Sequence, residues 1–354
     1  MQKKDKMTDI KTISLEDIKE FLKANNEKEF RAKQIFHWLW QKNVQNFEEM
    51  TDLSKGLREK LQTEFIINPI KITYTANSSE DQSSKFAFST HDNLYIEGVL
   101  IPDNKRVTAC ISTQVGCPLA CTFCATGTMG LKRNLTTGEI YEQVFLLNQE
   151  AEKKHSRGLT NIVIMGMGEP LLNLDNTLRA IDFITGKTGL AMSPQRITLS
   201  TVGLIKQLKK LADANPKFNL AISLHTAINT KRSRIMPVNI HHSIPELIEA
   251  LKYYYEKTQN RITFEYLLIG GLTDTMEDAK ALAIFCRNFP TKVNLIEFNP
   301  VAHTDYKKSK AEDVDNFYEF LKSKNMVVTI RRSKGQDIDA ACGQLALKTK
   351  NTEK

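Results

Sequence analysis

Hydrophobic and polar positions divide the chain into a helical start, a short strand-rich stretch and a longer alternating part. Three segments have apolar residues at helical spacing: 14–26, 30–42 and 53–65. Three later segments are rich in β-branched and aromatic residues and predict strands that include a hairpin: 70–76, 85–90 and 93–101. We therefore expect a small N-terminal accessory domain of helices and strands over residues 1–96.

From about Val107 onward, short β-branched runs alternate with amphipathic segments. The predicted strands are residues 107–113, 161–167, 196–201, 218–225, 261–269 and 292–299. The predicted helices between them are residues 136–151, 174–185, 205–214, 243–257 and 276–289. This order predicts an α/β core over residues 97–345 in which a parallel sheet curls into a partial (β/α)6 barrel, followed by a polar tail over 346–354. Chemistry in such barrels lies at the C-terminal ends of the strands.

Composition and charge favour a folded protein that binds a polyanion. Hydrophobic residues make up 41% and charged residues 25%, which is ordinary for a globular domain. The first 96 residues carry 15 basic and 15 acidic side chains, so the whole net charge of +8 lies in residues 97–354, the predicted core and tail. Such an excess attracts nucleic acid or anionic lipid. No apolar stretch has the length of a membrane helix or a secretory signal, so we expect a cytoplasmic protein that does not bind membranes.

Three cysteines, Cys117, Cys121 and Cys124, form a C-x3-C-x2-C motif in the loop after the first barrel strand. Thiolates are good ligands for iron-sulfur clusters and for zinc. A structural zinc site usually takes four ligands in two pairs, and the sequence has no matching second pair. Three thiolates on a [4Fe-4S] cluster leave one iron free to bind the amino and carboxylate groups of S-adenosylmethionine (SAM). The spacing is the hallmark of the radical-SAM superfamily.

Other residues at strand ends are candidate SAM ligands. In the turn Gly-Met-Gly168-Glu169-Pro, glycine lets the backbone approach a ligand, and the carboxylate can bind the SAM ammonium. The remaining candidates end the third, fourth and sixth strands: Ser200, Ser223, Leu224, His225 and Asn299. A lone serine or histidine at a strand end is more often structural, and this alternative stays open for them.

Several motifs together resemble one family. GQDIDAACGQL (335–345), Cys110, CPLACTFC, MGMGEPLLN and SLH occur in an order similar to that of the radical-SAM dual-specificity 23S rRNA and tRNA adenine-C2 methyltransferases. The resemblance covers nearly the whole chain. It implies one [4Fe-4S] cluster, two SAM molecules per turnover, 23S rRNA and tRNA as partners, and an electron donor such as flavodoxin. We expect a monomer.

The resemblance also implies a role for three further residues. Cys342 takes a methyl group from one SAM, and a radical made from a second SAM activates that group for addition to adenine C2. RNA and protein are then joined through a thioether carbon until Cys110 attacks the Cys342 sulfur, which leaves a transient disulfide. Glu97 matches the family's candidate for the base that removes the C2 proton. The alternatives are an inert core thiol for Cys110 and a solvent-facing strand residue for Glu97.

Two other functions remain open. One is the related adenine-C8 branch, although Pro170 favours C2. The other is a non-catalytic RNA-binding protein with a zinc or cluster staple. Cations near the reactive cysteines are expected to hold RNA phosphates: Arg331, Arg332, Lys334, Lys132 and Arg133. Cys286 shares one helical face with apolar residues and is assigned to the core.

Overall fold

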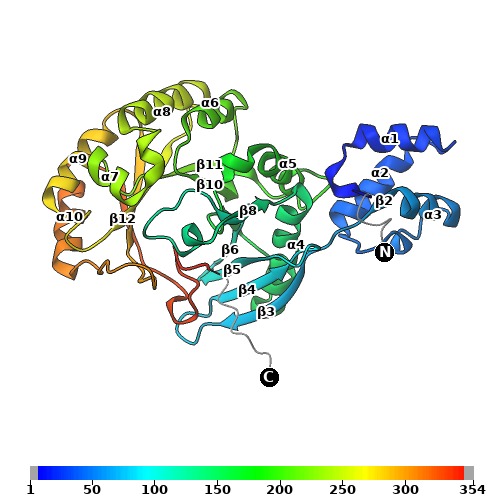
Figure 1. The fold of residues 1–354 in the computed structure, drawn as a ribbon, viewed down its shortest axis with the longest axis horizontal. Helices are drawn as coiled ribbons and strands as arrows, with labels where there is room; N and C mark the ends of the chain where they lie inside the picture. The colour runs from blue at the N-terminus through cyan, green and yellow to red at the C-terminus, as the bar shows by residue number, and fades with distance from the viewer. Residues whose placement is uncertain (1–6, 347–354) are drawn as a thin grey trace.

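A ten-stranded sheet organises the computed structural model, which describes residues 7–346 (Figure 1). Its strands are β3 (Lys71–Asn77), β4 (Ser84–Ser89), β5 (Tyr95–Asp103), β6 (Arg106–Ile111), β9 (Asn161–Ile164), β10 (Ile197–Thr201), β11 (Asn219–Ser223), β12 (Ile262–Leu268), β13 (Thr291–Glu297) and β14 (Val328–Arg331). The spatial order is β14-β13-β12-β11-β10-β9-β6-β5-β4-β3. Strands β6 and β9–β14 run parallel, whereas β3–β6 pair antiparallel.

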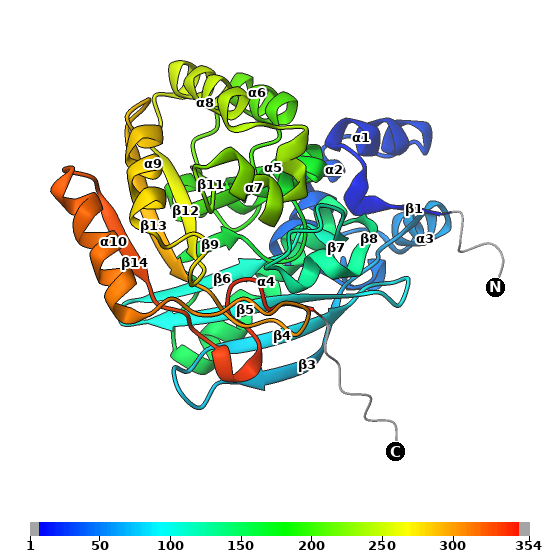
Figure 2. The same ribbon diagram turned by 60° about the vertical axis from the view of Figure 1, so that its left-hand side comes forward.

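Helices cover the outer face of the curled sheet (Figures 1 and 2). They are α4 (Thr137–His155), α5 (Leu174–Thr185), α6 (Ile205–Asp213), α8 (Ile244–Thr258), α9 (Met276–Cys286) and α10 (Ala311–Ser323). The short helix α7 (Asn229–Ile235) lies instead beside the cysteine loop. The parallel strands β11 and β12 are nearly continuous runs of buried residues, as expected where both faces of a sheet are covered. Helix α4 begins with a capping box between Thr136 and Glu139. The predicted α/β fold with a partial barrel is confirmed.

The N-terminal module, residues 8–66, packs beside α4 (Figure 1). It contains β1 (Thr8–Asp9), α1 (Leu15–Ala24), α2 (Arg31–Phe36), α3 (Lys55–Glu64) and β2 (Phe65–Ile66). A buried ion pair fixes it to the core, because Lys11 Nζ contacts the carboxylate of Glu142 and donates to Asn43 Oδ1 at 2.8 Å. Glu142 Oε2 also accepts a hydrogen bond of 2.7 Å from the Ile70 amide.

The chain divides differently from the predicted boundary at residue 96. That residue lies inside β5, and β3 and β4 join the large sheet through β5 rather than pairing with the N-terminal module. On these contacts we place the boundary near residue 70. The hairpin pattern predicted the strands correctly but gave no information about their partners.

Several core elements were not predicted from the sequence, among them β14, α10 and α7. Strand β14 is short and only half-buried, so its periodicity is weak. It adds a further parallel strand beyond the six predicted, with α10 as the connecting helix. Helix α7 lies in a polar stretch of the loop after β11. The predicted tail lies outside the described residues, apart from Ala346. Within residues 7–346 no helix is long and apolar enough to cross a membrane.

Candidate active site

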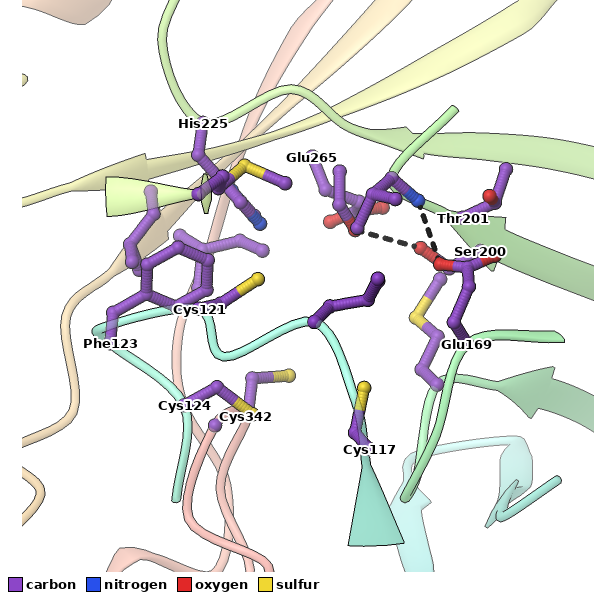
Figure 3. Close-up of a pocket in the computed structure, with 18 of the residues that line it drawn as sticks. Cys117, Cys121, Phe123, Cys124, Glu169, Ser200, Thr201, His225, Glu265 and Cys342 are labelled. Atoms are coloured by element: carbon purple, nitrogen blue, oxygen red, sulfur yellow. Dashed lines mark hydrogen bonds between the residues drawn. The ribbon is translucent and has the colours of Figure 1, made fainter. Parts of the chain in front are cut away.

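A cavity lies inside the partial barrel at the C-terminal ends of its strands. This first cavity, counted with the part that opens to solvent, has a volume of about 950 Å³. It brings together ten of the residues singled out in the sequence: Cys117, Cys121, Cys124, Gly168, Glu169, Ser200, Ser223, His225, Asn299 and Cys342. Figure 3 shows the labelled cysteines gathered on one side of the cavity, with Glu169, Ser200 and Thr201 on the other.

The cysteine loop, residues 117–124, lies in the connection between the two paired strands β7 (Gln114–Cys117) and β8 (Gly130–Asn134). Gly116 has φ +80°, and a side chain there would collide with the Gly130 carbonyl, so the close hairpin requires glycine. The Cys124 amide donates to the Cys121 carbonyl at 3.1 Å, and the Thr122 amide donates to the Ile235 carbonyl of α7 at 3.0 Å. The loop is therefore shaped by its own turns and held by the barrel.

The three thiols of this loop have the chemistry of cluster ligands. Burial raises the pKa of Cys117 to about 12, and burial and the neighbouring thiols also raise the pKa values of Cys121 and Cys124. A bound cationic cluster would reverse this effect by stabilising the thiolates. No three such side chains in residues 7–346 converge on a single metal ion. A cubane cluster needs no such convergence, because its thiolates bind different irons.

The Gly166–Pro170 turn packs tightly against the chain that precedes the cysteine loop. Gly168 has φ +98°, and a Cβ atom there would lie 2.5 Å from Gln114 Cβ. Glu169 is almost fully buried, and its carboxylate accepts hydrogen bonds of 3.0 Å from the Leu171 and Val202 amides. Burial raises the pKa of Glu169 despite these bonds. The turn thus presents a fixed carboxyl group to the cavity.

The other predicted SAM ligands differ in their placement. Ser200 Oγ and Ser223 Oγ lie 3.2 Å apart. His225 has φ +60° and no partner for Nδ1 within the described chain, and burial lowers its pKa to about 3, which keeps the ring neutral. The Leu224 side chain is buried and does not line the cavity. Asn299 lines it, and its amide donates to the Cys342 carbonyl at 3.1 Å.

A second cavity adjoins the first and brings Cys110 and Cys342 together. Cys110 is buried in β6, and burial, the main cause, raises its pKa to about 12. Cys342 is exposed. Cys286, in contrast, is buried in α9 and lines neither of these cavities, so its assignment to the core is confirmed.

The C-terminal segment, residues 335–346, contains Cys342 and is drawn in red in Figure 2. The Gly335 amide donates to Asp81 Oδ2 at 2.7 Å, which ties the segment to the β3–β4 connection. At the other end, the Ala125 amide donates to the Gly343 carbonyl at 2.7 Å, and Thr126 Oγ1 donates to the Leu345 carbonyl at 2.6 Å. The segment therefore bridges the antiparallel strands and the cysteine loop.

Glu97 lies under this C-terminal segment rather than in either cavity lining. Its carboxylate accepts a hydrogen bond of 3.0 Å from the Ala346 amide and lies 3.5 Å from Lys85 Nζ. The side chain is almost completely buried, so it does not face solvent. The β5–β6 register pairs Val99 with Cys110, which places Glu97 on the same face of the sheet as Cys110.

Sequence reasoning missed Glu265, a carboxylate in the wall of the first cavity. It is buried on β12, and Asn294 Nδ2 donates to its Oε1 at 2.8 Å. Burial raises the pKa of Glu265, and its Oε2 lies 3.9 Å from the Arg331 guanidinium, which lines both cavities. The available signal was a single carboxylate within the otherwise apolar run ITFEYLLI.

Arg133, one of the cations expected to hold RNA phosphate, is paired with carboxylates of the protein. Its guanidinium donates to Asp92 at 2.7 and 2.8 Å and to both oxygens of Glu139 at 2.8 Å. These two carboxylates neutralise the cation, and the hydrogen bonds from Arg133 hold the pKa of Asp92 well below its usual range. Arg133 therefore ties the β8 hairpin to the start of α4.

Comparisons with known proteins agree with this geometry. Residues 8–67 match the ribosomal RNA large subunit methyltransferase N-terminal domain, and residues 111–283 match the radical SAM superfamily. The probable dual-specificity RNA methyltransferase RlmN of Cytophaga hutchinsonii is 48% identical, over 96% of this chain and 93% of its own length. The Bacillus subtilis protein described in the same words is 44% identical, over 97% and 94%.

A solved structure supports the same relationship. The crystal structure of a radical SAM methyltransferase from Sphaerobacter thermophilus superposes with a TM-score of 0.88 at 38% identity, covering 96% of this chain and 99% of that one. The alternative of a non-catalytic RNA-binding protein disagrees with these relatives, which are described as methyltransferases. The chain belongs to the RlmN family of radical SAM, SAM-dependent RNA methyltransferases.

Proposed function

We propose that this protein methylates C2 of an adenine in 23S rRNA and in certain tRNAs. The observation that carries the proposal is the placement of Cys342. This exposed thiol comes from the far end of the chain, yet it lines the same cavity as Cys117, Cys121 and Cys124. Relatives with the printed name dual-specificity RNA methyltransferase support the substrate class.

The first cavity is the proposed SAM site. Cys117, Cys121 and Cys124 would hold one [4Fe-4S] cluster, which supplies the electron for reductive SAM cleavage when bound. Glu169 and the Gly168 backbone would orient the SAM amino group. The remaining proposed contacts come from the ends of β10, β11 and β13: Ser200, Ser223, the Leu224 backbone, His225 and Asn299.

Cys342 is the proposed methyl carrier. Adenine C2 is an electron-poor carbon that does not displace a methyl group from SAM, whereas a thiolate does. One SAM would methylate the Cys342 sulfur and a second would be cleaved, which gives two SAM molecules per turnover. Cys342 lines the SAM cavity, so its sulfur is positioned to serve in both steps.

Cys110 and Glu97 are proposed to complete the reaction. The Cys110 thiolate would attack the Cys342 sulfur, forming an S–S bond as the bond from that sulfur to the RNA-linked carbon breaks. The carbon keeps the electron pair and takes a proton, which completes the methyl group. Before that attack, Glu97 would accept the adenine C2 proton while the unpaired electron of the RNA adduct returns to the oxidised electron donor; the position of Glu97 on the same sheet face as Cys110 supports this role. A two-electron reductant would then restore both thiols.

The proposal also covers the electron donor, the oligomeric state and the cellular location of the enzyme. We infer that an external donor such as flavodoxin supplies electrons, that the enzyme acts as a monomer, and that it meets its RNA substrates in the cytoplasm.

Nucleoside mass spectrometry tests the proposed target atom. RNA from cells that lack the gene should lose 2-methyladenosine at specific 23S rRNA and tRNA positions, and the gene restored on a plasmid should return it. Appearance of 8-methyladenosine instead would assign the enzyme to the C8 branch.

A further inference from the structure

Helix α7 carries a completely buried arginine, Arg232. Lys11 and Lys85 are also buried, and each has a carboxylate partner: Glu142 for Lys11 and Glu97 for Lys85. Arg232 forms no ion pair with any carboxylate of residues 7–346. A buried charge is costly unless another charge compensates it. The fold therefore holds a buried cation whose countercharge is not a carboxylate of the described chain.

The Arg232 guanidinium is surrounded by uncharged oxygen atoms. Its five hydrogen bonds end on the carbonyls of Val202 (2.7 Å), Leu224 (3.2 Å), Ser223 (3.4 Å) and His242 (3.5 Å), and on Asn239 Oδ1 (2.8 Å). Val202 directly follows β10, and Leu224 directly follows β11. These bonds satisfy the donors of the guanidinium and hold two strand ends together, but they supply no negative charge.

Helix α7 also holds the cysteine loop. The Thr122 amide and hydroxyl donate to the Ile235 carbonyl of α7 at 3.0 and 3.3 Å. Burial is the main cause that raises the pKa of Cys121, and the positive charge of Arg232 acts in the opposite direction. The same attraction from Cys121 favours the protonated form of Arg232. The thiols of the cysteine loop are therefore within the electrostatic reach of Arg232.

A cluster bound by this loop would be the missing anion. A [4Fe-4S] core held by thiolates is negatively charged overall, and its reduction by one electron adds a further negative charge. A fixed cation nearby stabilises the reduced form more than the oxidised form, because the Coulomb energy grows with charge. Burial lowers the pKa of Arg232 to about 10, so the side chain is still protonated at neutral pH.

We propose that Arg232 is a positioning residue: its guanidinium holds the ends of β10 and β11, and its buried positive charge raises the reduction potential of the cluster bound by Cys117, Cys121 and Cys124. This inference rests on the proposed function, because it needs those three cluster ligands. Arg232 lines neither cavity, so it acts on the cluster through space. The electron itself still comes from an external one-electron donor.

Neutralising Arg232 in place tests the proposal. Asn239→Asp replaces the oxygen that accepts from Nη1 with a carboxylate of the same size, and the guanidinium keeps that carboxylate ionised. The reconstituted enzyme, without SAM or RNA, would be titrated anaerobically with dithionite and redox mediators, and the reduced cluster would be measured by electron paramagnetic resonance. At the wild-type midpoint we expect the ratio of reduced to oxidised cluster to fall about 10-fold, which is a potential lower by about 59 mV.

Two further variants separate charge from packing. Asn239→Ala loses the same bond to Arg232 and the bonds from Nδ2 to Asn229 and Ser233, but it adds no charge. Its ratio should stay within about 2-fold of wild type. Arg232→Met removes the cation and should lower the ratio at least as far as Asn239→Asp does. Iron analysis and circular dichroism identify a variant that does not fold, and if Arg232→Met fails there, Asn239→Asp decides.

The outcomes that would overturn the proposal are distinct from failure of the proposed function. Full iron content with an unshifted ratio in Asn239→Asp would show that the charge of Arg232 does not act on the cluster. An equal shift in Asn239→Ala would assign the effect to packing and would also overturn the proposal. If wild type itself binds no [4Fe-4S] cluster, the proposed function fails instead.

The carboxylate of SAM is the rival countercharge for Arg232. In that case Asn239→Asp would weaken SAM binding, as measured by calorimetry, and would leave the potential without SAM unchanged. This result would overturn the proposed effect on the cluster, because the anion that Arg232 stabilises would then arrive with the substrate.

Discussion

The cysteine loop and the C-terminal segment reach the same cavity by different routes. Cys117, Cys121 and Cys124 lie within eight residues, so local turns and one short hairpin bring their thiols together. Cys342 is placed instead by contacts with Asp81, Ala125 and Asn299, which come from three separate parts of the chain. The cluster site is thus mainly a local structure, whereas the carrier site depends on the whole fold. Substitutions in the two regions should therefore impair different steps of the reaction.

Loss of one thiol from the cysteine loop should have the largest effect. Cys121→Ser replaces a soft ligand by a hydroxyl, so the reconstituted protein should hold far less than the about four irons expected per chain. SAM cleavage and RNA methylation should both be lost. Iron and sulfide analysis with a 5'-deoxyadenosine assay checks this. Full iron content in this variant would contradict the ligand assignment.

Loss of the Cys342 thiol should remove RNA methylation but not cluster binding or SAM cleavage. Cys342→Ala should abolish RNA methylation, by about 10³-fold or more, because no nucleophile remains to take the methyl group. Iron content and reductive SAM cleavage should remain close to wild type. Cys286→Ala is the matched control, since that thiol lies in α9 away from the cavities. RNA methylation by Cys342→Ala would eliminate the carrier role.

Loosening the C-terminal segment should have an intermediate effect. Asp81→Ala removes the carboxylate that accepts the Gly335 amide hydrogen bond, which is worth about 1 kcal/mol at a partly exposed site. We expect methylation to fall about 3- to 10-fold while SAM cleavage is unchanged. Glu80→Ala, at the exposed neighbouring position, is the control. An equal loss of both activities would mean that the segment does not act on Cys342 separately.

The smallest effect is expected at Arg133. Asp92 and Glu139 already satisfy its guanidinium, so Arg133→Gln should change RNA affinity by less than about 2-fold and leave its salt dependence unaltered. Fluorescence anisotropy over a salt series measures both. A reduced salt slope would show that this cation contacts phosphate after all. Circular dichroism would verify that the variant remains folded.

The same contrast explains how far the sequence predicted the structure. Apolar periodicity located the buried strands of the barrel, and cysteine spacing located the cluster loop, because both depend on neighbouring residues. Apolar periodicity missed β14, whose residues are half-buried. The predicted domain boundary also fell inside β5. Glu265 was missed because its importance comes from Asn294 and Arg331, which approach it only in the fold.

Arg133 and Arg332 show the same limit for charged residues. Both look like solvated cations in the sequence. The fold pairs Arg133 with two carboxylates and leaves Arg332 beside the second cavity without such a partner in residues 7–346. The difference depends on which segments pack nearby, and local sequence contains no signal for it.

Mass spectrometry of the tryptic peptide that contains Cys342 tests the central claim most directly. Enzyme incubated anaerobically with SAM labelled by deuterium in its methyl group should carry one labelled methyl on Cys342 before RNA is added. The label should leave this peptide and appear on adenine when RNA and reductant follow. Methylated RNA formed while the Cys342 peptide never acquires label would contradict the account.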